Sequence, residues 1–235
     1  MYNVKNNNKK LLYLVKKKKM AEDFPDICDS LENPNGLLAI GGTLSEKKLL
    51  CAYKKGIFPW YNEGQPILWW SPNPRCVIKP NELHISHSLK KCLKKRHFKI
   101  TFNHDFKNVI NECSVNRTNN DTWLTNDMKF AFTHLHNSGY AHSIECWNNT
   151  KLVGGLYGIA MGKIFFGESM FSRESNASKI ALVYLSRRLE KMKFQFIDCQ
   201  VSSNHLLTLG ARLIERNEFS KVLDNYCNYS KAVFE

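Results

Sequence analysis

Residues 142–201 predict a definite order of secondary structure: three strands, a helix and a fourth strand. The predicted antiparallel strands are His142–Trp147, Lys151–Ile159 and Lys163–Gly167. The helix runs from Asn176, as its cap, to Lys191. Its predicted inner face comprises Ile180, Ala181, Tyr184, Leu185 and Leu189. By itself this order indicates an α/β protein with a mixed sheet.

The fourth strand, Phe196–Val201, carries two polar side chains in an otherwise apolar segment. Alternation along a strand puts Phe196, Asp198 and Gln200 on one face. Buried polar groups are costly unless they are paired. An Asp beside a Gln can pair and can orient a third group, which indicates a functional site. The alternative is that Asp198 is a satisfied polar residue of the core.

A second carboxylate, Glu168, comes directly after Gly167 and the apolar run Ile164–Phe166. Glycine lets a substrate approach the backbone at the end of a strand. Glu168 alone could equally cap a turn or form a local salt bridge, because ion-pair networks occupy such positions too. Its combination with Asp198 and Gln200 favours a functional site.

A series of short blocks extends this pattern over nearly all of residues 24–219. The blocks are Asn35–Gly42, Ala52–Trp60, Trp69–Arg75, Thr122-Trp123, Gly139–Trp147, Leu152–Gly158, Gly167–Ser172, Asn176–Lys179, Asp198–Gln200 and Leu209–Ala211. In these blocks, their order and their spacing, the chain resembles the bacterial leucyl/phenylalanyl-tRNA–protein transferases. No single block is decisive, but the set is highly specific.

The resemblance implies transfer of Leu or Phe from aminoacyl-tRNA to the α-amino group of proteins that begin with Arg or Lys. The products would be degraded by the N-end rule pathway. This reaction is aminolysis of an activated ester and requires no cofactor or metal. On this basis Asp198 would hydrogen-bond Gln200 and fix its amide, and Gln200 would present its carbonyl oxygen to the attacking amine. Glu168 would attract either the ammonium group or the cationic side chain of the acceptor.

Further roles follow from matching positions. Trp60 and Trp123 would stack on the 3′ end of the tRNA, although large rings are also common in cores. A pocket for the transferred side chain would be formed by Leu156, Phe165, Leu185, Leu189 and Ile197, each of which could equally be ordinary core. A basic helix beginning at Ser86 or Ser88 offers backbone contacts through Lys90, Lys91, Lys94, Lys95 and Arg96.

The resemblance also implies a small N-terminal α/β domain followed by a core like that of the Gcn5-related acetyltransferases. We expect a basic tail and the small domain in residues 1–74 and the catalytic domain in residues 75–235. The boundary lies in a segment, residues 57–82, that prolines interrupt repeatedly. The order of strands, helix and strand in residues 142–201 fits such a core.

Charge and cysteine content bound the cellular setting. The net charge is +13, of which residues 1–20 supply +7 through seven lysines. The remaining excess suits a protein that meets phosphate backbones. Eight scattered cysteines favour a reduced, cytoplasmic protein. No apolar run is long enough to span a bilayer, no cysteine–histidine spacing predicts a metal site, and we expect a monomer.

Two other functions compete with the transferase. An acetyltransferase using acetyl-coenzyme A usually holds the pyrophosphate with a glycine-rich loop before a helix. The corresponding segment here, Met170–Ser175, has no glycine and contains an acid. A non-catalytic tRNA-binding protein would use the basic surface and the aromatic rings. It would have no use for Asp198 and Gln200.

Overall fold

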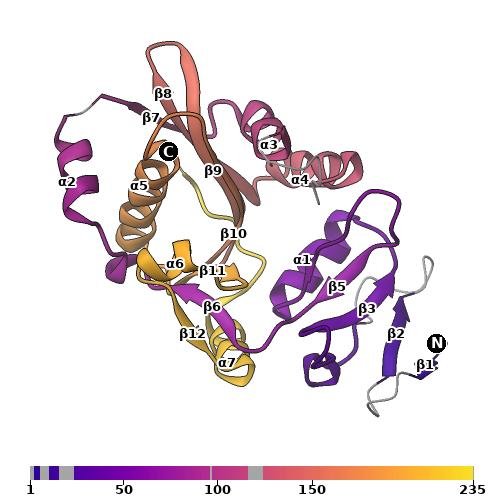
Figure 1. Cartoon of the computed structure of the whole chain (residues 1–235). Coiled ribbons are helices and arrows are strands. Elements are labelled where there is room, and N and C mark those ends of the chain that lie inside the picture. The colour runs from indigo at the N-terminus through magenta and orange to yellow at the C-terminus, as the bar shows by residue number, and fades with distance from the viewer. Residues whose placement is uncertain (1–2, 6–10, 16–23, 96, 116–123, 235) are drawn as a thin grey trace.

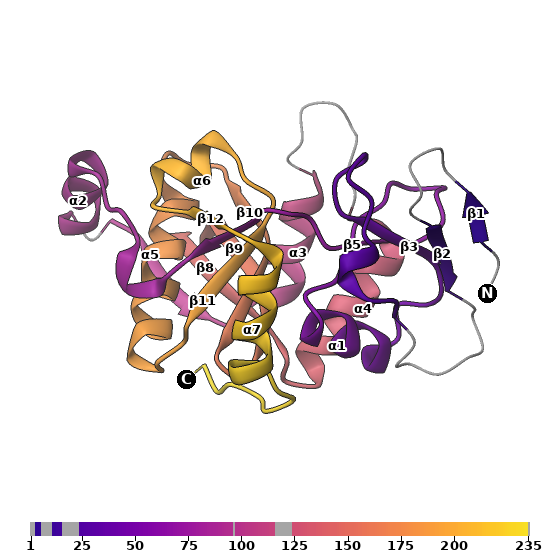
Figure 2. The same cartoon turned by 90° about the horizontal axis from the view of Figure 1, so that it is seen from below.

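A computed structural model describes residues 3–5, 11–15, 24–95, 97–115 and 124–234 (Figure 1). Within these residues the strands form two sheets, one of five strands and one of seven. Figure 2 shows the smaller sheet at one end of the molecule and helix α2 (His87–Lys94) at the other, with the larger sheet between them. No helix in the described part of the chain is long and apolar enough to cross a membrane.

The smaller sheet contains the N-terminal strands. Its order is β1 (Asn3–Lys5), β2 (Leu11–Val15), β3 (Leu37–Gly41), β5 (Leu68–Trp70) and β4 (Phe58–Pro59). Two helices accompany these strands along the chain: the 3-10 helix η1 (Ile27–Asp29) and α1 (Glu46–Lys54). Helix α1 begins at the predicted cap, because the Ser45 hydroxyl accepts a hydrogen bond from the Lys48 amide. It ends before Gly56, whose φ of +73° suits glycine.

The larger sheet confirms the predicted mixed architecture. Its order is β12 (Arg212–Ile214), β6 (Arg75–Ile78), β11 (Phe196–Gln200), β10 (Ile164–Ser172), β9 (Lys151–Met161), β8 (Ala141–Asn148) and β7 (Lys99–Phe102). Strands β7 to β10 are antiparallel neighbours, whereas β10 and β11 are parallel. Helix α5 (Ala177–Lys191) connects the parallel pair. The strand–helix–strand order predicted for residues 142–201 is therefore correct.

Helices cover both faces of this sheet. The remaining ones are η2 (Pro80–Glu82), α3 (Phe106–Val115), α4 (Asn126–Asn137), α6 (Asn204–Thr208) and α7 (Arg216–Tyr226). In β9, Tyr157 and Ile159 pack with α3, and Leu156 and Ala160 pack with α5. This alternation is the period of two expected of a strand buried on both faces. Figure 1 shows α3 and α5 on opposite sides of the sheet.

Helix α5 has the predicted cap position and the predicted end, but two details of the prediction are wrong. Tyr184 was placed on the inner face, but it is 36% exposed and lies against the Arg187 guanidinium. Asn176 occupies the cap position without a capping hydrogen bond from its side chain. The Ser172 hydroxyl instead accepts from the amide of Ser178. A partner four residues before the cap position cannot be found by rules that consider the cap position alone.

Candidate functional site

The candidate site lies where β10 and β11 separate. The two strands are paired only from Ile164–Phe166 to Phe196–Asp198. Immediately beyond this pairing, register irregularities occur in β10 between Gly167 and Ser169 and in β11 between Asp198 and Gln200. Because both strands depart from regular geometry at the same level, side chains beyond that level face a gap in the sheet.

Two adjoining cavities open at this gap. One has a volume of about 260 Å³ and a largely apolar wall, and the other has a volume of about 410 Å³. Four residues line both: Glu168, Cys199, Gln200 and Ser203. The predicted pair of Glu168 and Gln200 therefore lies at the shared boundary of two cavities, where two substrates could meet.

The strand alternation predicted for β11 fails at Gln200. This residue has a φ of +57°, a left-handed conformation that costs a non-glycine residue roughly 1–2 kcal/mol. Asp198 is fully buried, whereas the side chain of Gln200 joins Ile197 and Cys199 at the cavity wall. The bulge therefore turns Gln200 away from the face that it would share with Asp198 in a regular strand.

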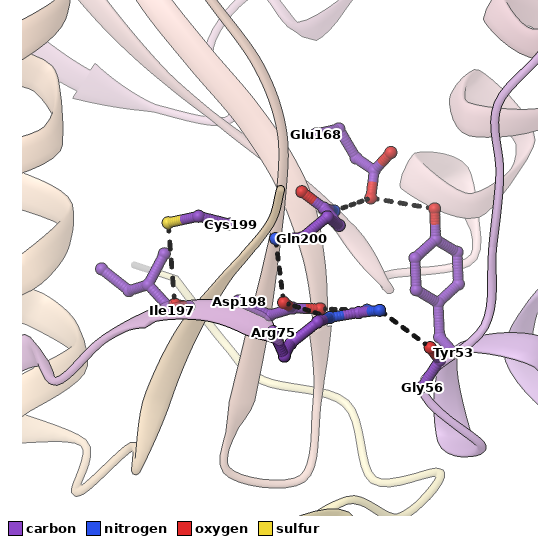
Figure 3. A network of polar contacts seen from close by, with 8 residues as sticks. All are labelled: Tyr53, Gly56, Arg75, Glu168, Ile197, Asp198, Cys199 and Gln200. Atoms are coloured by element: carbon purple, nitrogen blue, oxygen red, sulfur yellow. Dashed lines mark hydrogen bonds and ion pairs between the residues drawn. The ribbon is translucent and has the colours of Figure 1, made fainter. Parts of the chain in front are cut away.

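The predicted hydrogen bond from the Gln200 amide to Asp198 is also wrong. Asp198 instead forms a bidentate ion pair with Arg75, with Nε to Oδ1 at 2.8 Å and Nη2 to Oδ2 at 2.7 Å. Its Oδ1 also accepts from the backbone N–H of Gln200 at 3.0 Å (Figure 3). Asp198 thus holds the backbone of Gln200 rather than its side chain.

The side-chain amide of Gln200 is oriented by Glu168. Gln200 Nε2 donates to Glu168 Oε1 at 3.3 Å, and the Tyr53 hydroxyl donates to the same oxygen at 2.9 Å. With its NH₂ group directed at a carboxylate, Gln200 keeps its carbonyl oxygen for another donor, and Figure 3 shows that oxygen pointing away from Glu168. This geometry is compatible with the expectation that Gln200 presents its side-chain carbonyl oxygen to the attacking amine. The group that orients the side chain is Glu168 rather than Asp198.

The electrostatic environment of Glu168 is unusual for a carboxylate. Burial raises the pKa of Glu168 from 4.5 to about 8. The Tyr53 hydrogen bond lowers this pKa, the neighbouring charge of Asp198 raises it, and the charge of Arg75 lowers it. A carboxyl group with a pKa near 8 is suited to exchange a proton at neutral pH.

Replacing Glu168 with Gln should stabilise the folded protein at neutral and alkaline pH. The folded pKa lies above the unfolded value, so the wild type loses stability as the pH rises from about 4.5 to about 8. A neutral amide avoids that loss. We expect a gain on the order of 2–4 kcal/mol in unfolding free energy at pH 8, vanishing near pH 4.5. Urea unfolding across this range measures it.

Glu82→Gln provides the matched control, because Glu82 is an exposed carboxylate. This control should change the unfolding free energy little at any pH in the range. An equal gain for Glu168→Gln at both ends of the pH range would contradict a raised pKa of Glu168 as the cause.

Four of the five residues predicted for the side-chain pocket line the smaller cavity: Leu156, Phe165, Leu185 and Ile197. Leu189 does not line it and is fully buried in the core beneath. Residues that sequence reasoning missed are Ile78, Tyr157, Met170, Leu182 and Leu206, together with Ser203 and His205. Several come from β6 and α6, and no local pattern relates them to β10.

The larger cavity has an aromatic wall. It is formed by Phe58, Pro59 and Trp60 opposite Cys199, Gln200 and Val201. Trp60 is 44% exposed, and its backbone is held by hydrogen bonds to Leu68 and from the Trp70 indole. Trp69 is fully buried, and its indole N–H donates to the carbonyl oxygen of Gly41. Trp123 lies outside the described residues.

The predicted basic face is found on α2, which is capped by Ser86 rather than Ser88. Leu89 packs against Ile180 and Val183 of α5. The exposed side chains include Lys90, Lys91, Lys94 and Lys95. Arg96 lies outside the described residues. Within the described ranges, no three His, Cys, Asp or Glu side chains gather as a metal site would require.

Arg75 and Tyr53 were assigned no role from the sequence. A signal for Arg75 was present: it is the cation in the apolar strand Arg75–Ile78, and a buried cation requires an anion. Asp198, a carboxylate in another apolar strand, was the natural partner. Tyr53 gave no such signal, since its place on the apolar side of α1 is that of an ordinary core residue.

Comparisons with known proteins agree over most of the chain. Residues 42–73 match a family model described as the leucyl/phenylalanyl-tRNA protein transferase N-terminal domain, and residues 77–224 match that of leucyl/phenylalanyl-tRNA protein transferase. A curated protein of that name from Pseudomonas aeruginosa is 55% identical over 87% of this chain and 91% of its own length. One from Cellvibrio japonicus is 53% identical over 87% of each chain.

Similar solved structures are more distant. A GCN5-related N-acetyltransferase from Kribbella flavida aligns with a TM-score of 0.33 and 8% identity, covering 68% of this chain and 58% of that one. The structure of L-PGS from Bacillus licheniformis aligns with a TM-score of 0.41 and 9% identity, covering 71% and 55% respectively.

Proposed function

Because the chain belongs to the leucyl/phenylalanyl-tRNA–protein transferase family, it is an aminoacyltransferase, and we propose that it transfers Leu or Phe to proteins beginning with Arg or Lys. Its substrates are aminoacyl-tRNA and an acceptor protein. The observation that carries the proposal for the site is the shared position of Glu168 and Gln200 in two adjoining cavities. A transfer reaction needs such a boundary, because two substrates must meet there.

We assign the apolar cavity to the leucyl or phenylalanyl side chain. Its volume of about 260 Å³ and its lining by Leu156, Phe165, Leu185 and Ile197 suit an apolar side chain that is not branched at Cβ. Apolar pockets discriminate by only about 1–3 kcal/mol per methylene, so the shape of this cavity must reject smaller and β-branched side chains.

We assign the larger cavity to the 3′ end of the tRNA. The exposed ring of Trp60 offers a stacking surface for the terminal base, and the ester would then lie beside Gln200. Trp123 remains a proposed second stacking partner. Lys90, Lys91, Lys94 and Lys95 on α2 are proposed contacts for the RNA backbone, since exposed cations with no intervening acid favour phosphate.

Glu168 is suited to remove the proton from the acceptor. An α-ammonium group has a pKa of about 7.7–8.0, close to the value of about 8 for Glu168. Proton transfer between them is therefore almost balanced in free energy. The freed amine donates an N–H to the Gln200 carbonyl oxygen while its nitrogen attacks the ester carbon. The C–N bond forms, the C–O bond to the ribose breaks, and the second proton lost by the attacking nitrogen passes to the ribose oxygen.

The acetyltransferase alternative receives no support from the start of α5. Ser172 Oγ accepts from the Ser178 amide there, and the backbone of β9 packs closely, since a Cβ at Gly154 would lie 2.5 Å from that of Ala177. Pyrophosphate binding needs free amides at a helix N-terminus. We further propose that the protein works in the cytoplasm as a monomer and marks acceptors for degradation by the N-end rule pathway.

A direct assay tests the function. Purified protein is incubated with radiolabelled Leu-tRNA and a model protein that begins with Arg, beside a copy that begins with Ala. Label entering only the Arg-starting protein supports both the transfer and the acceptor rule. Label entering both would leave the transferase without the proposed acceptor rule, and label in neither would refute the proposed activity.

Replacing Trp60 with Ala should raise the KM for Leu-tRNA by about 5- to 150-fold, the equivalent of about 1–3 kcal/mol of base stacking. The rate at saturating Leu-tRNA should change much less, because Trp60 does not contact the reacting atoms in this proposal. Steady-state kinetics with varied Leu-tRNA measures both. Phe130→Ala is the control, since Phe130 is 78% exposed on α4. An unchanged KM for Trp60→Ala would remove Trp60 from the binding site.

A further inference from the structure

Arg75 is the most completely buried cation at the site, with 1% of its surface exposed. Its Nη1 donates to the carbonyl oxygen of Gly56 at 3.0 Å. Its guanidinium lies between the rings of Phe58 and Phe219, at 4.9 and 4.8 Å from their centroids. Together with the two bonds to Asp198, these contacts leave the planar group one orientation.

The ion pair reaches Gln200 through one oxygen atom. Asp198 Oδ1 accepts from Arg75 Nε at 2.8 Å and from the backbone N–H of Gln200 at 3.0 Å (Figure 3). The position of Oδ1 therefore sets the position of the backbone N–H of Gln200. Lysine could keep the charge at residue 75 but not the two parallel bonds that hold the carboxylate plane.

The backbone N–H held by Asp198 belongs to Gln200, the residue whose side chain the bulge turns into the cavities. Gln200 adopts a left-handed backbone conformation, which needs support from its surroundings. In the neighbouring aromatic wall, Phe58 lies against the guanidinium of Arg75, whereas Trp60, the proposed stacking ring, is held by its own hydrogen bonds to Leu68 and from Trp70. Loss of the guanidinium geometry should therefore disturb Gln200 more than Trp60 in the aromatic wall of the larger cavity.

We propose that Arg75 is a positioning residue for the transfer reaction: through Asp198 Oδ1 it holds the Gln200 backbone in the conformation that directs the Gln200 carbonyl at the acceptor amine. The inference rests on the proposed function. It differs from a role in stability alone because it predicts that Arg75 acts on the rate only by way of Gln200.

A double-mutant cycle on the transfer rate tests this. Arg75→Lys should lower the single-turnover rate of Leu transfer by about 30-fold or more in the wild-type background. In the Gln200→Ala background the same change should lower the remaining rate by no more than about 3-fold. The Kd for Leu-tRNA should stay within about 3-fold of the wild type throughout. Equal losses in both backgrounds would overturn the proposal.

The control is Arg173→Lys. Arg173 also pairs with a carboxylate, Glu112, but it is about half exposed and lines neither cavity. Its replacement should leave the rate unchanged. If Arg75→Lys does not fold, Phe219→Leu serves in the cycle, because it keeps both charges and removes one ring beside the guanidinium. It should show the same dependence on Gln200 with a smaller loss, and equal losses in both backgrounds would again overturn the proposal.

Failure of the function and failure of this inference give different results. A wild-type protein that transfers no Leu refutes the proposed function. A wild-type protein that transfers Leu while Arg75→Lys retains the full rate refutes only the role of Arg75.

Discussion

Gln200→Ala should lower the single-turnover rate of Leu transfer by about 10²–10³-fold, the usual cost of removing one preorganised polar group that acts on the reacting atoms. The variant lacks the amide carbonyl that we assign to the attacking amine. Its backbone N–H still has Asp198 as a partner, so the bulge should persist. Rapid mixing of excess enzyme with labelled Leu-tRNA and acceptor measures the rate.

Binding of tRNA separates this result from a binding defect. The Kd for Leu-tRNA should change little, because the aromatic wall and the basic helix are intact. Gln195→Ala is the matched control: Gln195 immediately precedes β11, and its side chain donates a local hydrogen bond to the Lys193 carbonyl. A Gln200→Ala variant that transfers Leu at the wild-type rate would sink the proposed role of Gln200. It would leave the family assignment standing.

Asp198→Ala should affect both stability and rate. It leaves the buried guanidinium of Arg75 without its anion, and breaking a buried pair in this way typically costs about 3–5 kcal/mol. It also removes the acceptor of the backbone N–H of Gln200, so we expect the transfer rate per folded molecule to fall by about 10²-fold or more. Urea unfolding and single-turnover kinetics measure the two losses separately.

A double replacement separates the two effects. Arg75→Met combined with Asp198→Leu replaces both charges with apolar groups, a change that is often neutral or stabilising for buried pairs. We expect this variant to recover most of the unfolding free energy and none of the transfer rate. Recovery of the rate together with stability would show that the ion pair contributes to folding alone.

Local patterns accounted for most of the secondary structure. The meander β8–β10, the helix α5 and the strand β11 follow from periodicities within a few residues, which depend little on the rest of the chain. The cap at Ser45 and the end of α1 before Gly56 are equally local. The error at Asn176 occurred where Ser172, outside the helix, accepts the hydrogen bond of the first turn, and Tyr184 lies beside Arg187 of its own helix.

The site was predicted in part. Glu168, Asp198 and Gln200 were identified as buried or strand-end polar residues, and four of five pocket residues line the apolar cavity. Their pairing was predicted wrongly. A regular strand would place Asp198 beside Gln200, and only the bulge and the left-handed Gln200 separate them.

The sequence by itself determined the order of the elements, the family, and which polar residues stand in apolar strands. These properties depend on residue identity and on spacing along the chain. The tertiary structure alone decided the partners: Arg75 for Asp198, Tyr53 and Gln200 for Glu168, and the raised pKa of Glu168. Partners and pKa values depend on distances and burial between segments far apart in the chain, such as Tyr53 and Glu168, which no local pattern encodes.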